Sequence, residues 1–180
     1  MTKFILIRHG EPSYKEVEAK EFKGHGCDLA FLSEKGIEQA KKASESYLLS
    51  NSEILLTSPY TRCMQTASII SNQINLPIIG EVDLHEWLPD ISFNYQNKDL
   101  VLYNYERAIN DYLYNQVTSL EYESIYRVQI RVLKVLKKYL EYQKIIVVTH
   151  GGVIFSLTEK HIPYCGIEEI NYDGKKLIKG

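Results

Sequence analysis

Two histidines near opposite ends of the chain each follow an apolar run and precede a glycine. The first lies in residues 4–10 (FILIRHG) and the second in residues 144–152 (KIIVVTHGG). In an open parallel sheet, chemistry collects beyond the carboxyl ends of the strands. If these two runs form neighbouring strands, one site receives the imidazoles of His9 and His150, the guanidinium of Arg8 and several glycine amides. Such a site is suited to binding a phosphate group.

The Arg8-His9-Gly10 triplet contains the groups that phosphoryl transfer needs. A neutral imidazole nitrogen of His9 can attack phosphorus without a metal, and a reference pKa of about 6.5 leaves it mostly neutral at pH 7. Arg8 can donate to two phosphate oxygens at once, which a lysine cannot do. Gly10 allows a close approach of the backbone. The triplet alone is a weak signal, because most such triplets are structural.

Arg62 is a second candidate for binding phosphate. The dipeptide Ser58-Pro59 predicts a helix start, with Ser58 as N-cap and proline at the first helical position. Arg62 then falls in the first turn, where free N–H groups and the positive end of the helix dipole favour an anion. The alternative is an ordinary surface arginine.

Glu86 is a candidate proton donor. Its neighbours Trp87 and Leu88 would desolvate the carboxyl group and raise its pKa, which suits a general acid. From these residues alone, Asp83 and Asp90 are equally good candidates.

The hydrophobic pattern alternates between strands and helices, which favours one αβα domain over residues 1–180. We expect strands at 3–7, 53–57, 77–82 and 145–149, and helices from Ser33 as N-cap to about 51, from 58 to about 73, around 101–112, around 125–139, and from about 152 to 161. Residues 10–32 are expected to be a loop with one short helix, and residues 84–97 a lid or rim loop. Asp173-Gly174 indicates a hairpin within residues 167–178.

Bulk composition excludes several classes. The formal charge of −2 gives no support for nucleic-acid or membrane binding. No apolar run exceeds four residues, so no transmembrane span is expected. Three cysteines without a C-x-x-C pair are typical of reduced thiols, and we expect a cytoplasmic protein. The sequence does not define an oligomeric state.

Four motifs occur in the order R-H-G, S-P-x-x-R-x-x-Q-T-A, L-x-E and T-H-G-G, and residues 24–40 (GHGCDLAFLSEKGIEQA) add a fifth segment. Together they resemble the histidine phosphatase superfamily, also called phosphoglycerate-mutase-like. The resemblance implies a three-layer αβα sandwich with a mixed, mostly parallel central sheet, and chemistry without metal or cofactor. It also implies a role for each matching residue: His9 as the nucleophile that becomes a phosphohistidine, Arg8 and Arg62 as phosphate clamps, His150 as a donor to the phosphoryl oxygens, Glu86 as proton donor, and Gly10 and Gly151 as backbone near the substrate.

The chain departs from that pattern after Arg8-His9-Gly10, where many members carry a Trp-Asn pair and this chain has Pro12 to Lys15. Lys15 is therefore a candidate substrate contact, as is His85 beside Glu86. The expected function is hydrolysis of a phosphorylated small molecule whose identity the sequence leaves open.

Other functions fit the sequence less well. A mutase is disfavoured because two amphipathic helices fill most of the interval from Glu86 to His150. A member that binds phospho-ligands without catalysis is an alternative, but all of the central residues are present. A zinc hydrolase lacks ligand spacing such as H-E-x-x-H, and the signatures of cysteine phosphatases, P-loop NTPases and α/β-hydrolases are absent.

Overall fold

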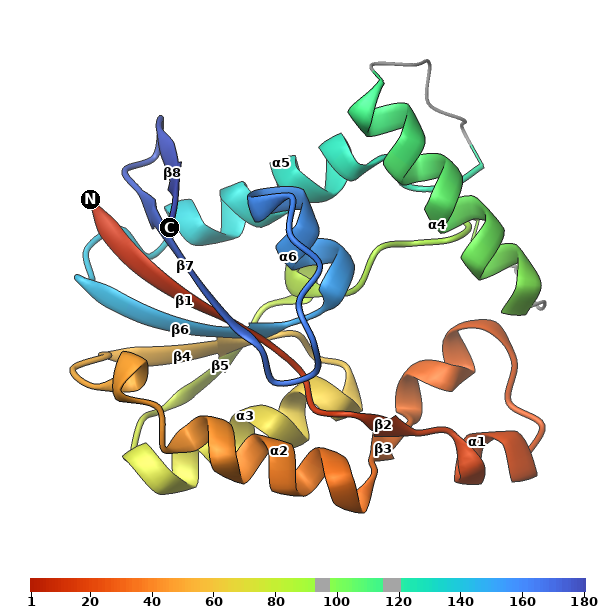
Figure 1. Cartoon of the computed structure of the whole chain (residues 1–180), viewed down its shortest axis with the longest axis horizontal. Coiled ribbons are helices and arrows are strands. Elements are labelled where there is room, and N and C mark those ends of the chain that lie inside the picture. Colours follow the sequence, from red (N-terminus) through yellow and green to blue (C-terminus); the bar gives the residue numbers. More distant parts are fainter. Residues whose placement is uncertain (93–97, 115–120) are drawn as a thin grey trace.

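A central sheet runs through the molecule in the strand order β5-β4-β6-β1-β7-β8 (Figure 1). The computed structural model describes residues 1–92, 98–114 and 121–180. The strands are β1 (Thr2–Arg8), β4 (Ile54–Thr57), β5 (Ile78–Gly80), β6 (Lys144–Thr149), β7 (Ile167–Tyr172) and β8 (Leu177–Lys179). Neighbours among β5, β4, β6 and β1 are parallel, whereas β7 and β8 are antiparallel to the strands beside them.

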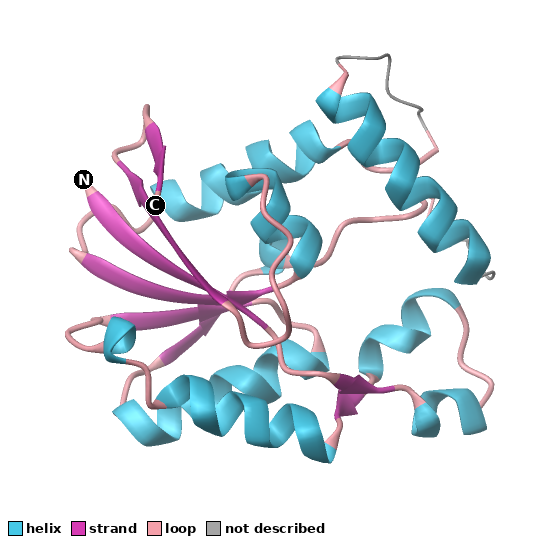
Figure 2. Cartoon of the chain, in the orientation of Figure 1, coloured by secondary structure: helices cyan, strands magenta, loops and turns pink. Residues whose placement is uncertain are grey.

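Helices cover both faces of this sheet (Figure 2). Alternate residues of β1 point to opposite sides: Ile5 and Ile7 pack in one core cluster, Phe4 and Leu6 in the other. The first cluster is covered by α3 (Thr61–Ile74), against which α2 (Glu34–Ser44) packs. The second is covered by α5 (Ile125–Lys137) and α6 (Gly151–Thr158), with α4 (Lys98–Leu113) beside α5. The expected αβα sandwich with a mixed, mostly parallel sheet is confirmed.

The ends of two predicted helices are wrong. Ser33 caps α2 as expected, since its hydroxyl accepts from the backbone N–H of Gly36 at 3.0 Å, but the helix ends at Ser44 instead of near residue 51. Ser46 has extended backbone and its hydroxyl accepts from Leu48 N–H, which starts a separate 3₁₀ turn over Tyr47–Leu49. Helix α6 ends at Thr158 instead of 161, because Glu159 adopts a left-handed conformation.

The predicted start of α3 is also wrong. The helix begins at Thr61 with Tyr60 as N-cap, so Ser58 lies ahead of the cap and Pro59 is not at the first helical position. The Ser58 hydroxyl accepts from the backbone N–H of Tyr60 at 3.3 Å and lies 2.8 Å from Nε2 of His150. Arg62 still falls in the first turn, as expected.

Residues 10–32 leave the carboxyl edge of the sheet and carry more structure than expected. Besides the short helix α1 (Lys15–Ala19), they contain a 3₁₀ turn (Gly24–Leu29) and two short paired strands, β2 (Pro12–Ser13) and β3 (Phe31–Leu32). This segment extends from the sheet toward the amino-terminal end of α4 (Figure 1). The start of this segment lies against α2 at Gly36, where an added Cβ would clash with the carbonyl oxygen of Glu11.

Three further expectations concern a strand, a hairpin and a loop after α3. The predicted strand at 77–82 is shorter, spanning Ile78–Gly80, because Val82–Leu84 form a 3₁₀ turn. The hairpin around Asp173-Gly174 is confirmed by the pairing of β7 with β8. Of the predicted rim loop at 84–97, residues 93–97 lie outside the described residues.

Candidate active site

His9 and His150 meet at the carboxyl edge of the sheet. They follow β1 and β6 directly, and these strands are parallel neighbours in which Arg8 pairs with Thr149. Equal register at the strand ends brings the two imidazole centroids to 5.2 Å, with the rings edge to face. The condition on which the predicted site depends, that the two strands are adjacent, is therefore met.

Arg62 lies between the two imidazoles. Because it is in the first turn of α3, its guanidinium reaches the sheet edge, where Nε donates to Nε2 of His9 at 3.2 Å and Nη2 lies 3.4 Å from Nδ1 of His150. The residue is 5% exposed. One planar cation thus faces both imidazoles, which is the geometry that would bind an anion placed between them.

The contacts of His9 define its tautomer. Nδ1 lies 2.7 Å from the carbonyl oxygen of Gly10, which can only accept, so Nδ1 carries the proton. Nε2 then has a free lone pair and accepts from Arg62. Burial, reinforced by the charge of Arg62, lowers the pKa of His9 to about 3. His9 is therefore neutral at physiological pH, with its unprotonated Nε2 on the side of Arg62.

His150 is fully buried, and both ring nitrogens have partners. Because Nδ1 accepts from Arg62, Nε2 carries the proton and donates to the Ser58 hydroxyl at 2.8 Å. Burial, and then the positive charge of Arg62, lower its pKa well below the ordinary value. The Tyr60 ring packs edge-on against the imidazole at 5.1 Å, which limits ring movement.

Arg8 approaches the site from the end of β1. Its Nη1 donates to the carbonyl oxygen of Ile162 at 2.8 Å, and its guanidinium lies 4.2 Å from the centre of the Tyr164 ring. The buried Nε has no hydrogen-bond partner among the described residues. An added Cβ on Gly151 would lie 3.4 Å from this Nε. The absence of a side chain at Gly151 therefore leaves room for the guanidinium.

Glu86 is the carboxylate that faces this cluster. Its Oε1 accepts from the backbone N–H groups of Trp87 at 2.9 Å and Gly152 at 3.2 Å, whereas Oε2 lies 3.9 Å from Nδ1 of His150. Burial raises the pKa of the carboxyl group, although the Trp87 N–H and the nearby arginines oppose the shift. Neither Asp83 nor Asp90 lines the cavity described below, so the structure separates three candidates that the sequence could not.

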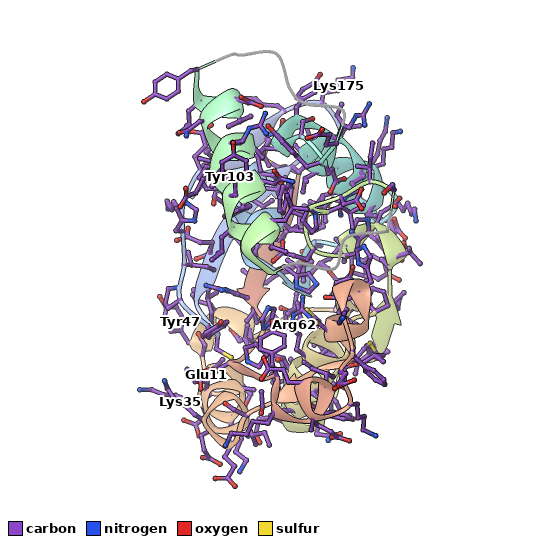
Figure 3. All side chains as sticks on the ribbon, turned by 90° about the vertical axis from the view of Figure 1, so that its right-hand side faces the viewer. Glu11, Lys35, Tyr47, Arg62, Tyr103 and Lys175 are labelled. Carbon is purple, nitrogen blue, oxygen red and sulfur yellow. The ribbon has the colours of Figure 1, made fainter. Side chains whose placement is uncertain are left out.

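These groups open into a cavity of about 600 Å³ between α4 and residues 10–32. Figure 3 looks onto this side of the molecule, with Arg62 between α4 and the segment below it. Of the predicted site residues, Arg8, His9, Arg62, Glu86 and Gly151 line the cavity. His150 lies buried against Arg62, outside the lining.

Three other predicted contacts lie outside the cavity lining. Lys15 is exposed on α1. His85 stacks on Tyr60, and its Nδ1 donates to the carbonyl of Glu86 at 2.6 Å. Gly10 donates its N–H to the hydroxyl of Thr66 at 3.0 Å. His85 and Gly10 thus contact residues next to the site and do not line the cavity themselves.

Asp28 is a site residue that the motif analysis missed. Its Oδ1 accepts from Nη1 of Arg62 at 3.1 Å, while Oδ2 lies 3.3 Å from Nδ1 of His25. A carboxylate is an unexpected neighbour for a phosphate clamp, because it repels the anion that the clamp would bind. Asp28 holds Nη1 of the Arg62 guanidinium, so that Nε and Nη2 face the two histidines. Asp28 lies in the segment GHGCDLAFLSEKGIEQA, but its residue type gave no sign of this contact.

The family follows from comparison with known proteins. The model of the histidine phosphatase superfamily, branch 1, matches residues 4–173. The chain belongs to this superfamily. Histidine phosphatases act on phosphorylated substrates, which agrees with a cavity lined by Arg8, His9 and Arg62, with His150 buried against Arg62.

Individual histidine phosphatases are similar over most of their length. A Hydrogenobacter thermophilus protein provisionally named phosphoserine phosphatase 2 is 26% identical over 98% of this chain and 92% of its own. The Bacillus subtilis phosphatase PhoE, itself uncharacterized, is 28% identical over 87% of this chain and 76% of its own. Among solved structures, a mycobacterial glucosyl-3-phosphoglycerate phosphatase matches with a TM-score of 0.71 at 16% identity, covering 94% of this chain and 89% of the other.

No helix in the described ranges has the length and apolar character needed to cross a membrane. In the same ranges, no group of three or more His, Cys, Asp or Glu side chains is placed to hold a metal ion.

Proposed function

We propose that this chain is a metal-independent phosphomonoesterase that works through a phosphohistidine on His9. The observation that supports this most is the tautomer of His9, which places an unprotonated Nε2 beside the guanidinium of Arg62. A nucleophile and a cation for the phosphoryl oxygens are then adjacent before substrate arrives. This pre-organisation is the main requirement for phosphoryl transfer.

In the first step, Nε2 of His9 attacks phosphorus and the bond from phosphorus to the ester oxygen breaks. Phosphoryl oxygens replace Nε2 as acceptors of the Arg62 N–H groups, and the unpartnered Nε of Arg8 supplies another donor. Glu86, whose pKa is raised by burial, gives its proton to the leaving oxygen. The products of this step are an alcohol and a phosphohistidine.

In the second step, water attacks phosphorus and the bond from phosphorus to Nε2 breaks. The Glu86 carboxylate accepts the water proton, so the acid is regenerated and His9 returns to its neutral form. Inorganic phosphate then leaves from Arg8 and Arg62. No group outside the described site is needed for the atoms and charges to balance.

Hydrolysis is favoured over mutase chemistry by the charges of the cavity wall. A mutase must hold an intermediate with two phosphate groups, which calls for cations beyond those at the reacting phosphate. Within the described residues between Glu86 and His150, the cavity lining consists of Trp87, Pro89, Val101, Leu102 and Tyr105, with no arginine or lysine.

The test combines turnover with trapping of the intermediate. We expect the protein to release phosphate from 4-nitrophenyl phosphate in the presence of EDTA, and rapid acid-free quenching to reveal acid-labile, base-stable label on one histidine. His9→Ala should lose both turnover and label, and thermal unfolding checks that the variant folds. Near-normal turnover by His9→Ala, or activity that EDTA abolishes and a divalent metal restores, would contradict the proposal.

A further inference from the structure

The cavity has two chemically different ends. At the sheet edge it carries the charged groups described above, whereas its outer walls are aromatic and aliphatic. One wall comes from the 10–32 segment with Tyr14 and Phe22, and the opposite wall comes from α4 with Val101, Leu102 and Tyr105. Trp87, Pro89, Ile162 and Tyr164 complete the apolar lining. A phosphomonoester bound at the charged end would extend its leaving group between these walls.

The polar side chains on the outer walls are few. Within the described part of the chain, no Ser, Thr, Asn or Gln lines the cavity, so tyrosine hydroxyls are the main neutral hydrogen-bonding side chains. The lining carboxylates are Asp28 and Glu86, and both are engaged, by Arg62 and by two backbone N–H groups respectively. A leaving group rich in hydroxyls would lose water here without gaining equivalent partners, which costs binding free energy.

The remaining cations do not change this picture. Lys23 is exposed at the cavity, so its charge is solvated, and the imidazole of His161 is exposed there as well. His25 lies 3.3 Å from Asp28, which offsets its charge when protonated. A second anionic group of a substrate would therefore find exposed, well-screened cations, which contribute little.

We propose that the preferred substrates are phosphomonoesters of aromatic or aliphatic alcohols, in preference to sugar or amino-acid phosphates. This inference rests on the proposed phosphomonoesterase function and adds the class of leaving group to it. Phosphoserine in particular would bring an ammonium group into a cavity whose described carboxylates already have partners. An aryl or alkyl chain instead fills the space between Phe22 and Leu102 with apolar contact.

The experiment compares leaving groups of matched chemical reactivity. Ethyl phosphate and 2-phenylethyl phosphate release alkoxides of nearly equal basicity, so a difference in kcat/KM reports contacts of the phenyl group. Burial of about 80 Å² of apolar surface predicts roughly a 30-fold preference for 2-phenylethyl phosphate. Glycerol 3-phosphate and O-phosphoserine, which add polar groups instead, should be turned over no faster than ethyl phosphate.

Variants then assign the preference to the two walls. Phe22→Ser and Leu102→Ser each remove one side chain that is already partly exposed, 41% and 70%, so the fold should tolerate both. We expect the double variant to reduce the 2-phenylethyl to ethyl ratio to about fivefold or less. Leu113→Ser is the matched control, because Leu113 lies on the same helix, is 53% exposed and does not line the cavity.

The possible results separate the two proposals. A ratio near one, or glycerol 3-phosphate or phosphoserine as the best substrate, would overturn the assignment of the leaving group while 4-nitrophenyl phosphate is still hydrolysed. An unchanged ratio in the double variant would also overturn it. Absence of both turnover and phosphohistidine with every substrate, including 4-nitrophenyl phosphate, would instead overturn the proposed function.

Discussion

Replacement of Glu86 by glutamine tests the proton donor with minimal structural change. Oε1 accepts two backbone N–H bonds, from Trp87 and Gly152, and the amide oxygen of glutamine can accept the same two. The amide nitrogen then occupies the place of Oε2, which lies 3.9 Å from His150 Nδ1 and makes no hydrogen bond to it. Glu86→Gln therefore keeps the shape and contacts of the site but removes the transferable proton.

The size of the effect depends on the leaving group. For an alkyl phosphate, loss of general-acid catalysis should lower kcat by about 10²–10⁴-fold. For 4-nitrophenyl phosphate the leaving phenolate is stable without a proton, so kcat should fall less than about tenfold. The contrast between the two substrates isolates protonation from binding, because both use the same phosphate contacts.

The pH dependence gives a second readout. The proposed mechanism requires Glu86 to be protonated, so the rate of the wild-type protein on an alkyl phosphate should decline as pH rises through the raised pKa of this carboxyl group. His9, with a pKa near 3 in the free protein, sets the limit on the acid side. Glu86→Gln should lose the alkaline decline. Equal losses of kcat on both substrates, or an unchanged pH profile, would refute the assignment of Glu86 as the acid.

The same variant should change stability in a defined direction. A carboxyl group whose pKa is raised in the folded state contributes stability at low pH that is lost as pH rises through the folded pKa. At high pH the folded protein must bury an ionised carboxylate, and Glu86→Gln removes that charge. The Tm of the variant should therefore exceed that of wild type at pH 8, with a smaller difference at pH 4. A lower Tm at pH 8 would mean that the ionised carboxylate stabilises the fold.

Two further changes test the surroundings of the phosphate. Arg62→Lys replaces a fork that contacts His9, Asp28 and His150 by a single ammonium group, and kcat should fall by about 10²–10³-fold in steady-state assays. Arg127→Lys, at an exposed position of α5, is the control, and an equal loss there would point to a general effect of the exchange. Asp28→Asn keeps an oxygen for Arg62 but removes a negative charge beside the anion site, so the inhibition constant of inorganic phosphate should fall about tenfold. Weaker inhibition by phosphate would mean that the charge of Asp28 is needed to hold Arg62 in place.

The residues that follow strands were the easiest to place from sequence. An apolar run before Arg8-His9 and another before His150 predict two strands, and parallel pairing brings their ends together. Arg62 needed only a helix start nearby, and it reached the site although the exact cap was wrong. Backbone geometry propagates along an element, so an error of two or three residues at its start does not displace the side chain from the sheet edge.

The surroundings of these residues were less accessible to sequence reasoning. Asp28 contacts Arg62 across 34 residues through an irregular segment whose path no local pattern defines. Ile162 and Tyr164 hold Arg8 from a stretch that carries no motif. Lys15 was selected by its position after the Arg8-His9-Gly10 triplet, but sequence distance does not give the direction of a side chain at the start of a short helix. Its exposed position on α1 is a result of the tertiary fold.

The stretch between α6 and β7 connects the two ends of the chain at the candidate site. The backbone N–H of Cys165 donates to the carbonyl of Arg8, and Arg8 in turn donates to the carbonyl of Ile162. Truncation after α6 would therefore retain every motif residue yet remove the partners of this arginine and the whole antiparallel border of β1. The motifs alone therefore do not show that a fragment or a shortened relative is active. The position of Arg8 also depends on the residues after α6, which contact this arginine and pair with β1.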